Sequence, residues 1–396
     1  MLDLGSAPPS NAYLTRETLR APERWFPLRV LVCVNCWLVQ TEDFARSDEL
    51  FDAQYAYFSS FSATWLAHAA HYVDNMVALL NLNETSHVVE IGANDGYLLQ
   101  YVKAHGIPCT GVEPTTSTAA AARAKGIPIV EEFFSLRLAK DLVSQGMQAD
   151  LITANNVLAH VPDINDFVAG IAVLLAPRGV ATFEFPHLLR LVAGNQFDTI
   201  YHEHYSYLSL TVVARIFASG GLAVFDVEEH PTHGGSLRVF AQRSETGQRA
   251  PTPTVSQMVE RERLAGTNSV AYYTDCQVKA DKLKNEFLAF LLRVNRERRS
   301  VAAYGAAAKG NTLMNYAGVR PDLVPYVVDR NPAKQGKFMP GSRIPIVPES
   351  RLRASRPDYV VILPWNLREE LTRQLEYIKA WGGKFVTALP QLEVGQ

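Results

Sequence analysis

Short apolar segments alternate with amphipathic segments along most of the chain. In the first half, the apolar segments have the length of strands, and the segments between them have the spacing of helices. A helical pattern from about residue 63 to 82 precedes the first of them. Strands that alternate with helices predict a parallel sheet covered by helices, which is an α/β fold. The first three predicted strands lie at residues 88–91, 109–114 and 127–130, and a fourth strand, a helix and a fifth strand follow within residues 149–188.

Further patterns follow the parallel strands. Two strand-like segments, 224–227 and 236–242, predict an antiparallel hairpin. A linker-like stretch at 251–257 precedes a long polar helix from about 259 to 299, interrupted near Thr274. Strands and helices then alternate again as far as the C-terminus, which predicts a second α/β unit.

These patterns divide the chain into four parts. Residues 1–50 are a loop-rich N-terminal module, and residues 51–250 are the first α/β domain. Residues 251–299 are linker helices, and residues 300–396 are a smaller, Rossmann-like α/β domain. A chain of 396 residues is too long for a single hydrophobic core, which agrees with this division.

The composition is that of a soluble globular enzyme, with 47% hydrophobic and 20% charged residues. The net charge of -2 argues against non-specific binding of nucleic acid. The sequence lacks both an apolar run of the roughly 18 residues that span a bilayer and the pattern of a signal peptide, so we expect a cytoplasmic protein without membrane contact. Only two of the four cysteines are close together, which does not indicate a disulfide framework.

A glycine loop follows the first strand of the α/β domain. Residues from Gly92 to Gly96 join a buried strand to a helix, at the first βα turn of the sheet. Glu113 ends the second strand about twenty residues later, where an acidic residue accepts hydrogen bonds from a ribose. The loop has no Lys or Arg to meet a pyrophosphate. These features predict a cofactor that contains adenosine but no phosphate.

The loop has the pattern E-x-G-x-N-x-G rather than the dinucleotide pattern G-x-G-x-x-G. It resembles the first motif of the S-adenosylmethionine-dependent methyltransferases. Two asparagines lie just past the fourth strand, where open α/β sheets bind ligands. The residues that we expect to hold the cofactor are therefore Glu90, Gly92, Asn94, Gly96, Glu113, Asn155 and Asn156.

The densest group of polar side chains lies in the stretch D-T-I-Y-H-E-H-Y-S-Y-L-S, from 198 to 209. It contains Tyr201, Glu203 and His204. Histidine has an unperturbed pKa of about 6.5, so this stretch suits the removal of a proton from a bound molecule. The alternative is an aromatic helix start whose histidines only satisfy local hydrogen bonds. His160, just past the fourth strand, is a further candidate.

Other candidates carry a structural alternative of equal weight. Tyr55 and Tyr57 suit either a ligand pocket or the core. His233, in the sequence T-H-G-G-S, contacts a ligand or lies in a simple turn. Lys309 and Asn311 follow the glycine turn of the second α/β domain, where a helix start binds phosphate, but the same pattern fits a packing turn.

Cys33 and Cys36 form a C-x-x-C pair between two apolar runs. Such a pair is half of a four-cysteine zinc site, which needs a second pair. The sequence near it holds no second pair, so a structural zinc site and a reduced, inert pair both stay open. A segment before Met1 would supply the missing ligands.

The order of the motifs resembles the sugar C-methyltransferases of deoxysugar biosynthesis, and the resemblance covers essentially the whole chain. It implies an N-terminal zinc-binding piece, a methyltransferase domain and a C-terminal Rossmann-like domain. It also implies methylation of C-3′ of a dTDP-linked 4-keto-deoxysugar that lies between the two large domains. The motifs are C-x-x-C, YAYFSSFS, VVEIGANDGYLL, GVEP, NNVLAHVPD, FEFPHL, YHEHYSYLS, THGGSLRV and YGAAAKGNT.

The same resemblance implies roles for single residues. His204 is the expected general base that removes the C-3′ proton, and Glu203 either orients its imidazole or pairs with an amino group on the substrate. The other expected catalytic residues are Tyr201, His160 and Tyr55. The expected substrate-binding residues are Tyr57, His202, His233, Lys309 and Asn311. The family carries two C-x-x-C pairs, of which this chain holds the second, so the expected zinc site is half a site.

Three other functions fit part of the pattern. An O- or N-methyltransferase of a small metabolite would share the cofactor domain. An oxidoreductase would bind a dinucleotide at the C-terminal glycine loop, but that loop lacks the G-x-G-x-x-G spacing. A sugar-nucleotide-binding module would not need the polar residues of H-E-H. We expect the protein to be a monomer or a weak dimer.

Overall fold

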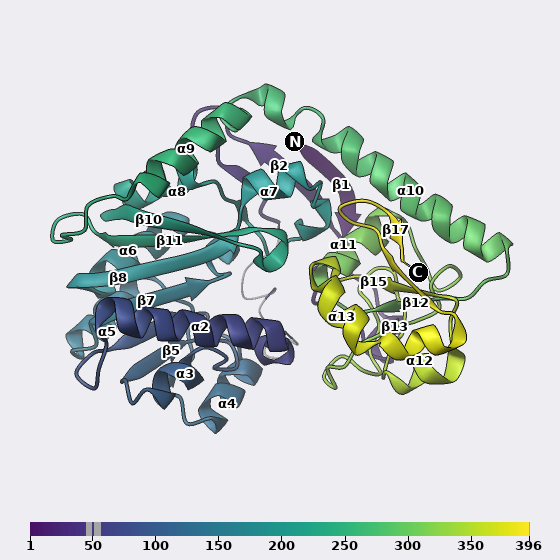
Figure 1. The fold of residues 1–396 in the computed structure, drawn as a ribbon, viewed down its shortest axis with the longest axis horizontal. Helices are drawn as coiled ribbons and strands as arrows, with labels where there is room; N and C mark the ends of the chain where they lie inside the picture. The colour runs from purple at the N-terminus through teal and green to yellow at the C-terminus, as the bar shows by residue number, and fades with distance from the viewer. Residues whose placement is uncertain (45–49, 51–56, 396) are drawn as a thin grey trace.

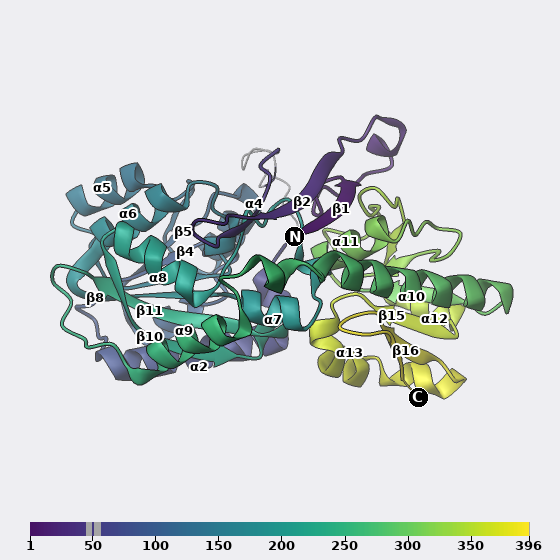
Figure 2. The same ribbon diagram turned by 90° about the horizontal axis from the view of Figure 1, so that it is seen from above.

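The computed structural model describes residues 1–44, 50 and 57–395. The chain forms two lobes that stand side by side, and a pair of helices runs above them from one lobe to the other (Figure 1). The strands of the N-terminal module lie at the junction of the lobes, on one side of it (Figure 2).

The first lobe contains a seven-stranded sheet in the order β6-β5-β4-β7-β8-β11-β10. Strands β4 to β8 are parallel, and the hairpin of β10 and β11 adds two antiparallel strands at one edge. This arrangement confirms the predicted Rossmann-like sheet with its terminal hairpin. The strands are β4 (Val88–Ile91), β5 (Cys109–Val112), β6 (Ile129–Val130), β7 (Ala149–Asn155), β8 (Leu175–Pro186), β10 (Leu222–His230) and β11 (Ser236–Arg243).

Helices cover both faces of this sheet. They are α2 (Ala63–Leu80), α3 (Leu99–Ala104), α4 (Thr116–Ala124), α5 (Leu136–Ser144), α6 (Ile164–Leu174) and α8 (Leu210–Ser219). Helix α7 (Leu188–Ala193) instead packs with the N-terminal strands, α10 and the second lobe. Phe167 of α6 shares a buried cluster with Val89 of β4. Tyr72 of α2 shares another cluster with Val88. Successive residues of a strand point to opposite faces, so these helices lie on opposite sides of the sheet.

The second lobe contains a six-stranded sheet in the order β14-β13-β12-β15-β16-β17, parallel except for β17. This sheet confirms the predicted C-terminal Rossmann-like α/β unit. Its strands are β12 (Val301–Tyr304), β13 (Val327–Val328), β14 (Ile346–Val347), β15 (Tyr359–Ile362), β16 (Lys384–Thr387) and β17 (Glu393–Val394). Its helices are α11 (Ala308–Tyr316), α12 (Ser350–Ser355) and α13 (Arg368–Gln374).

The N-terminal module forms a separate sheet of β1 (Leu2–Ala7), β2 (Phe26–Val32) and β3 (Val39–Thr41). Its fourth strand, β9 (Ser206–Tyr207), comes from the H-E-H stretch of the first lobe and pairs antiparallel with β3. The Thr41 hydroxyl also donates a hydrogen bond to the carbonyl of His204, at 3.0 Å. The module is thereby fixed to the stretch that the sequence singled out.

Helices α9 (Pro253–Ala265) and α10 (Cys276–Arg296) connect the two lobes. The break between them agrees with the predicted interruption near Thr274. The predicted linker at 251–257 is wrong for most of its length, because α9 begins at Pro253. Proline suits the first turn of a helix, where the missing N–H has no helical partner, so the cluster of prolines here starts the helix.

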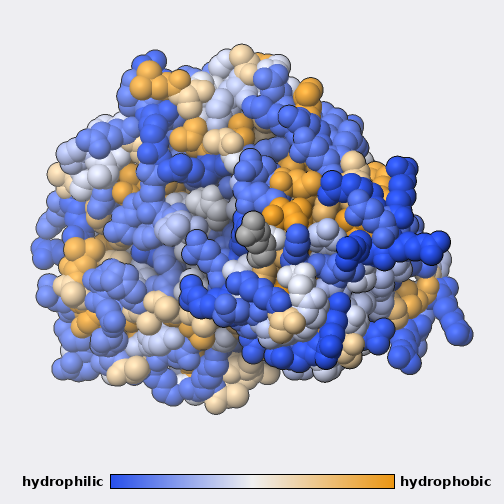
Figure 3. Space-filling model, turned by 45° about the vertical axis from the view of Figure 1, so that its right-hand side comes forward, coloured by the Kyte–Doolittle hydropathy of each residue, from blue (hydrophilic) through white to orange (hydrophobic). Residues whose placement is uncertain are grey.

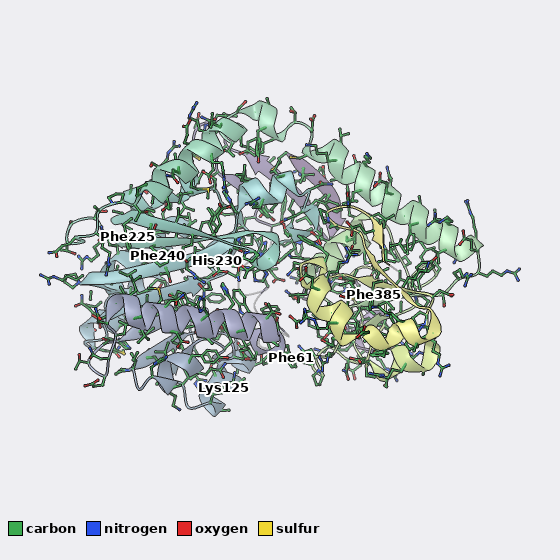
Figure 4. All side chains as sticks on the ribbon, viewed as in Figure 1. Phe61, Lys125, Phe225, His230, Phe240 and Phe385 are labelled. Carbon is green, nitrogen blue, oxygen red and sulfur yellow. The ribbon has the colours of Figure 1, made fainter. Side chains whose placement is uncertain are left out.

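A buried ion pair lies between β8 and β11. Arg238 Nη2 is 2.7 Å from Glu184 Oε2, and both side chains are almost fully buried. His68 of α2 and Thr232 also contact the Glu184 carboxylate, each at 2.7 Å. The pair therefore joins the hairpin to the sheet and to α2. His230 lies at the end of the hairpin that faces the second lobe (Figure 4).

The face in Figure 3 is mostly hydrophilic, and its apolar side chains form small groups. Among the helices in the described part of the chain, none is long and apolar enough to cross a membrane.

Candidate active site

A cavity of about 440 Å³ lies where the first lobe, the N-terminal module and the second lobe meet. It runs from the carboxyl ends of β4, β5 and β7 to the glycine turn before α11. Twelve of the residues that the sequence indicated line it: Tyr57, Gly92, Asn94, Glu113, Asn155, Asn156, His160, Tyr201, Glu203, His204, His233 and Lys309. Tyr55 lies outside the described residues.

The glycine loop forms one end of this cavity. Gly92 has φ +69, and a Cβ atom there would lie 2.6 Å from Val157 Cγ2, so only glycine fits this close approach. The backbone N–H of Asn94 donates to Glu113 Oε2 at 2.8 Å, and the N–H of Thr115 donates to Oε1 at 2.9 Å. These bonds hold the Glu113 carboxylate at the end of β5.

This end of the cavity fits S-adenosylmethionine. A buried carboxylate faces it for a ribose, and the apolar side chains of Val157, Phe133 and Phe134 line it beside the loop. The lysines among the described lining residues, Lys309 and Lys334, both come from the second lobe. The donor set at the loop therefore suits an adenosine group without phosphates.

Two residues of the predicted cofactor set lie behind the loop rather than along the cavity. Glu90 is 0% exposed, and burial raises the pKa of its carboxyl well above the ordinary value. Gly96 has φ +74, and a Cβ atom there would collide with the Ile127 side chain and approach Ala122. Neither residue is among those that line the cavity, which differs from the expectation that both lie along the cofactor.

Hydrogen bonds at both ring nitrogens set the orientation of His204. Nδ1 lies 2.8 Å from the carbonyl oxygen of Thr199, so Nδ1 carries the proton and Nε2 carries the lone pair. The Tyr201 hydroxyl donates to Nε2 at 2.8 Å. Burial, and then the neighbouring His160, keep the pKa of His204 well below its ordinary value. His204 is therefore a neutral base with its lone pair on Nε2.

His160 lies beside His204, with ring centroids 4.5 Å apart. Its Nδ1 donates to the backbone carbonyl of Glu203 at 2.7 Å. Burial lowers the pKa of His160 to about 4, so this ring is neutral as well. The structure thus brings together two neutral imidazoles whose Nδ1 protons are both bound by carbonyl groups.

The Glu203 carboxylate does not bind the imidazole of His204, which corrects one of its two expected roles. The carbonyl of Thr199 holds that ring instead. Both carboxylate oxygens of Glu203 accept from the amide of Asn11, at 2.9 and 2.7 Å. Asn11 and Thr199 were missed in the sequence, because Asn11 lies 192 residues away in an irregular loop and Thr199 acts through its backbone.

Two residues predicted to bind substrate lie outside the cavity. His202 Nε2 donates to the carbonyl of Pro27 at 3.1 Å, and its ring packs against Phe26 of the N-terminal module. Asn311 is 0% exposed and donates to the carbonyl of Ser10. Both residues connect the N-terminal module to the rest of the protein, and neither is among the residues that line the cavity.

His233 and Lys309 meet across the two lobes. His233 Nε2 lies 3.1 Å from the amide nitrogen of Asn156, and the ring packs edge-on against Trp65. Burial, followed by the charge of Lys309, lowers the pKa of His233 to about 4. Lys309 Nζ lies 3.4 Å from the His233 carbonyl and 3.2 Å from Asn366 Oδ1. These contacts join the cofactor end to the second lobe.

Cys33 and Cys36 lie in the turn between β2 and β3. Hydrogen bonds from the backbone N–H groups of Cys36 and Asn35 lower the pKa of the Cys33 thiol, which favours a metal-binding thiolate. Within residues 1–44, 50 and 57–395, no group of three or more Cys, His, Asp or Glu side chains is placed to hold a metal ion. The pair fits half of a zinc site and not a closed one.

Three family models match successive parts of the chain. Residues 1–51 match a model described as "Putative zinc binding domain". Residues 65–227 match "Methyltransferase domain", and residues 231–390 match "C-methyltransferase C-terminal domain".

Among solved structures, the chain is similar to magnesium protoporphyrin IX methyltransferase from Synechocystis. The two are 17% identical, the match covers 45% of this chain and 83% of that chain, and the TM-score is 0.36. The chain is also similar to an S-adenosylmethionine-dependent methyltransferase from Clostridium acetobutylicum, with 12% identity, 45% and 92% coverage, and a TM-score of 0.37. These scores are low, and we draw no argument from them.

A full-length relative is the C-methyltransferase NovU from Streptomyces niveus. It is 32% identical over 394 residues, which cover 100% of this chain and 93% of NovU. The fold, the glycine loop and the family models agree with this similarity. The chain belongs to the family of S-adenosylmethionine-dependent C-methyltransferases that includes NovU.

Proposed function

We propose that the protein methylates C-3′ of a dTDP-linked 4-keto-deoxysugar, with His204 as the general base. The observation that carries this proposal is the neutral imidazole of His204, which lines a cavity shared by the cofactor loop and the second lobe and carries its lone pair on Nε2. The name of the relative NovU supports methylation of carbon.

A carbon atom becomes a nucleophile only after it loses a proton, and a neighbouring carbonyl group makes that proton acidic. When the substrate binds, the Tyr201 hydroxyl turns from Nε2 to donate to the C-4′ oxygen, which frees the Nε2 lone pair. His204 Nε2 then takes the C-3′ proton, and the resulting imidazolium keeps its Nδ1–H bond to Thr199 while Tyr201 holds the enolate oxygen. S-adenosylmethionine supplies the electrophilic methyl group for the enolate carbon.

The second lobe offers the positive charge that a sugar nucleotide needs. Lys309 is in the first turn of α11, and its ammonium lies 4.9 Å from the centre of the Trp365 ring. Burial lowers the pKa of Lys309, and the nearby Asp198 carboxylate opposes this effect. We assign this lysine and the start of α11 to the phosphates of the nucleotide, and Tyr57 to the cavity wall beside the sugar.

Mass spectrometry of dTDP-4-keto-deoxysugars incubated with the enzyme tests this proposal. We expect a mass gain of one methylene on the sugar carbon when S-adenosylmethionine is present. In D₂O without the cofactor, we expect deuterium to enter at C-3′, because the base acts before the methyl group is transferred. Methylation of oxygen or nitrogen, without exchange at carbon, would replace this proposal by the O- or N-methyltransferase alternative.

The rate of methylation should change little with pH on the acidic side of neutrality. A general base must be unprotonated, and the pKa of His204 lies well below its usual value of about 6.5. We therefore expect kcat/KM to stay level as the pH falls from about 8 to about 6, and to decrease only at lower pH. A pH profile of kcat/KM checks this, and an acidic limb centred at an ordinary histidine pKa would contradict the buried, neutral state of the base.

A further inference from the structure

The segment from Ser10 to Tyr13 of the N-terminal module lies against the glycine turn of the second lobe. The Tyr13 hydroxyl donates to the carbonyl of Ala306 at 2.6 Å. Lys334 Nζ donates to the same carbonyl at 2.8 Å, and Asn311 donates to the carbonyl of Ser10. This segment is therefore held from the second lobe on both sides of Asn11.

Asn11 reaches from this segment into the first lobe. Its Nδ2 lies 2.9 Å from Glu203 Oε1 and 2.7 Å from Glu203 Oε2. An amide nitrogen only donates, so both oxygens of the carboxylate act as acceptors here. Glu203 is 1% exposed and lines the cavity together with Asn11. A buried carboxylate that accepts from an amide on both oxygens is stabilised in its ionised form.

We propose that Asn11 is a positioning residue of the active site, which holds the Glu203 carboxylate as an anion in a fixed orientation beside Tyr201 and His160. The proposal rests on the proposed function for the part that concerns the rate of methylation. It also means that the N-terminal module supplies a functional side chain to the cavity.

The charge of Glu203 has a direct effect on Tyr201. Burial raises the pKa of the Tyr201 hydroxyl well above its ordinary value, and the Glu203 charge raises it further. Tyr201 therefore keeps its proton and stays a hydrogen-bond donor, as stabilisation of an enolate oxygen requires. Asn11 acts on this donor through Glu203 and does not itself touch the reacting atoms.

Two substitutions at Asn11 separate this role from a general effect on folding. Asn11→Ala removes the amide that donates to both oxygens of Glu203, and we expect kcat to fall about tenfold or more because the carboxylate loses these two hydrogen bonds and its fixed orientation. Asn11→Asp has the same shape but places a second carboxylate beside Glu203. The matched control is Asn285→Asp, the same change at an exposed position of α10. We expect this control, and binding of S-adenosylmethionine by all variants, to match the wild type.

The pH dependence of Asn11→Asp is the decisive result. At low pH, the new carboxyl group is protonated and donates to Glu203, which replaces one bond of the asparagine. At higher pH, two adjacent carboxylates repel each other, so we expect kcat to fall as the pH rises from about 6 to 8.

The described titratable groups that face Glu203 are Tyr13, Tyr201 and His160. Burial raises the pKa values of Tyr13 and Tyr201; Lys334 opposes this effect at Tyr13, whereas the charge of Glu203 adds to it at Tyr201. Burial lowers that of His160 to about 4. Lys334, which contacts Tyr13, also has a raised pKa: burial alone would lower it, but Tyr13 and Asp329 raise it. Each of these groups keeps one protonation state between about pH 6 and 8, and the wild type should be level there.

Two results would overturn the inference while the proposed function stands. One is a rate near the wild-type value for both Asn11 variants, and the other is a pH profile of Asn11→Asp that runs parallel to that of the wild type. A second measurement does not depend on the substrate. In protein labelled with ¹³C at glutamate carboxyl carbons, the Glu203 signal, identified by its loss in Glu203→Gln, should titrate at higher pH in Asn11→Asp than in the wild type. An unchanged titration would overturn the inference even if no 4-keto sugar is methylated.

Discussion

Replacing His204 with alanine should lower the rate of methylation by about 10²- to 10⁴-fold, the usual contribution of a positioned general base. The imidazole of His204 lines the cavity with a neutral Nε2, and the variant leaves the Thr199 carbonyl and the Tyr201 hydroxyl without their hydrogen-bond partner on this ring. Mass spectrometry of the sugar in D₂O should show that both methylation and deuterium exchange are lost. Binding of S-adenosylmethionine should be kept, because His204 is not part of the glycine loop.

The neighbouring histidine of the same motif provides the control. His202 faces Pro27 and Phe26 of the N-terminal module, and His202→Gln keeps a side-chain donor for the carbonyl of Pro27. We expect this variant to keep most of its activity. If His204→Ala methylates at nearly the wild-type rate, or His202→Gln loses as much activity as His204→Ala, the base lies elsewhere, and His160 becomes the candidate.

Replacing Glu184 with alanine should reduce the free energy of unfolding by about 3–5 kcal/mol, because it removes the buried carboxylate that pairs with the buried guanidinium of Arg238. Both side chains of the pair are almost fully buried, and His68 and Thr232 lose a contact as well. Urea unfolding followed by circular dichroism measures the change. A loss below about 1 kcal/mol would mean that solvent reaches Arg238.

The second carboxylate on the same arginine is the matched control. Glu228 lies 3.3 Å from Arg238 Nη1, but its side chain is 48% exposed. Glu228→Ala should therefore cost about 0–1 kcal/mol, as exposed ion pairs do. The contrast between the two variants isolates the effect of burial, since the cation is the same.

The Glu184 pair also predicts how stability depends on pH. Burial would raise the pKa of this carboxyl, but His68, Arg238 and Thr232 lower it to about 2. The unfolded value is about 4.3, so the ionised carboxylate contributes its full stability above that pH. The contribution is lost as the pH falls toward 2. We expect Glu184→Ala to show a weaker loss of stability than the wild type over this acidic range.

Much of the fold follows from local patterns. The run V-V-E-I before the glycine loop predicted β4, and the two segments after residue 220 predicted the hairpin of β10 and β11. The residues that determine these elements lie within or next to them in the sequence. Gly92 is an example, because the loop after β4 has room only for glycine at that position. Helix α9 was misplaced because Pro253 was interpreted as part of a linker, whereas it starts the helix.

The site was predictable as a set of residue types but not as a set of contacts. The H-E-H stretch identified His204 correctly as a cavity residue, but spacing alone did not show that His202 faces the opposite way. Glu90 and Gly96 belong to the glycine motif, but both lie buried behind the loop. The motif alone does not show which of its residues face the cavity and which face the core. Asn11 has no local pattern, because its role depends on a contact with Glu203 across two modules.

The pairing of β9 with β3 bears on how this enzyme can be recombined with its relatives. The last strand of the N-terminal sheet is donated by residues 206–207, which lie far along the chain in the first lobe. A chimera that takes only its first fifty residues from a relative would pair the relative's β3 with the β9 of this chain, directly after the histidines of the H-E-H stretch. The unit that can be grafted intact is therefore discontinuous: it combines the N-terminal strands with the H-E-H stretch.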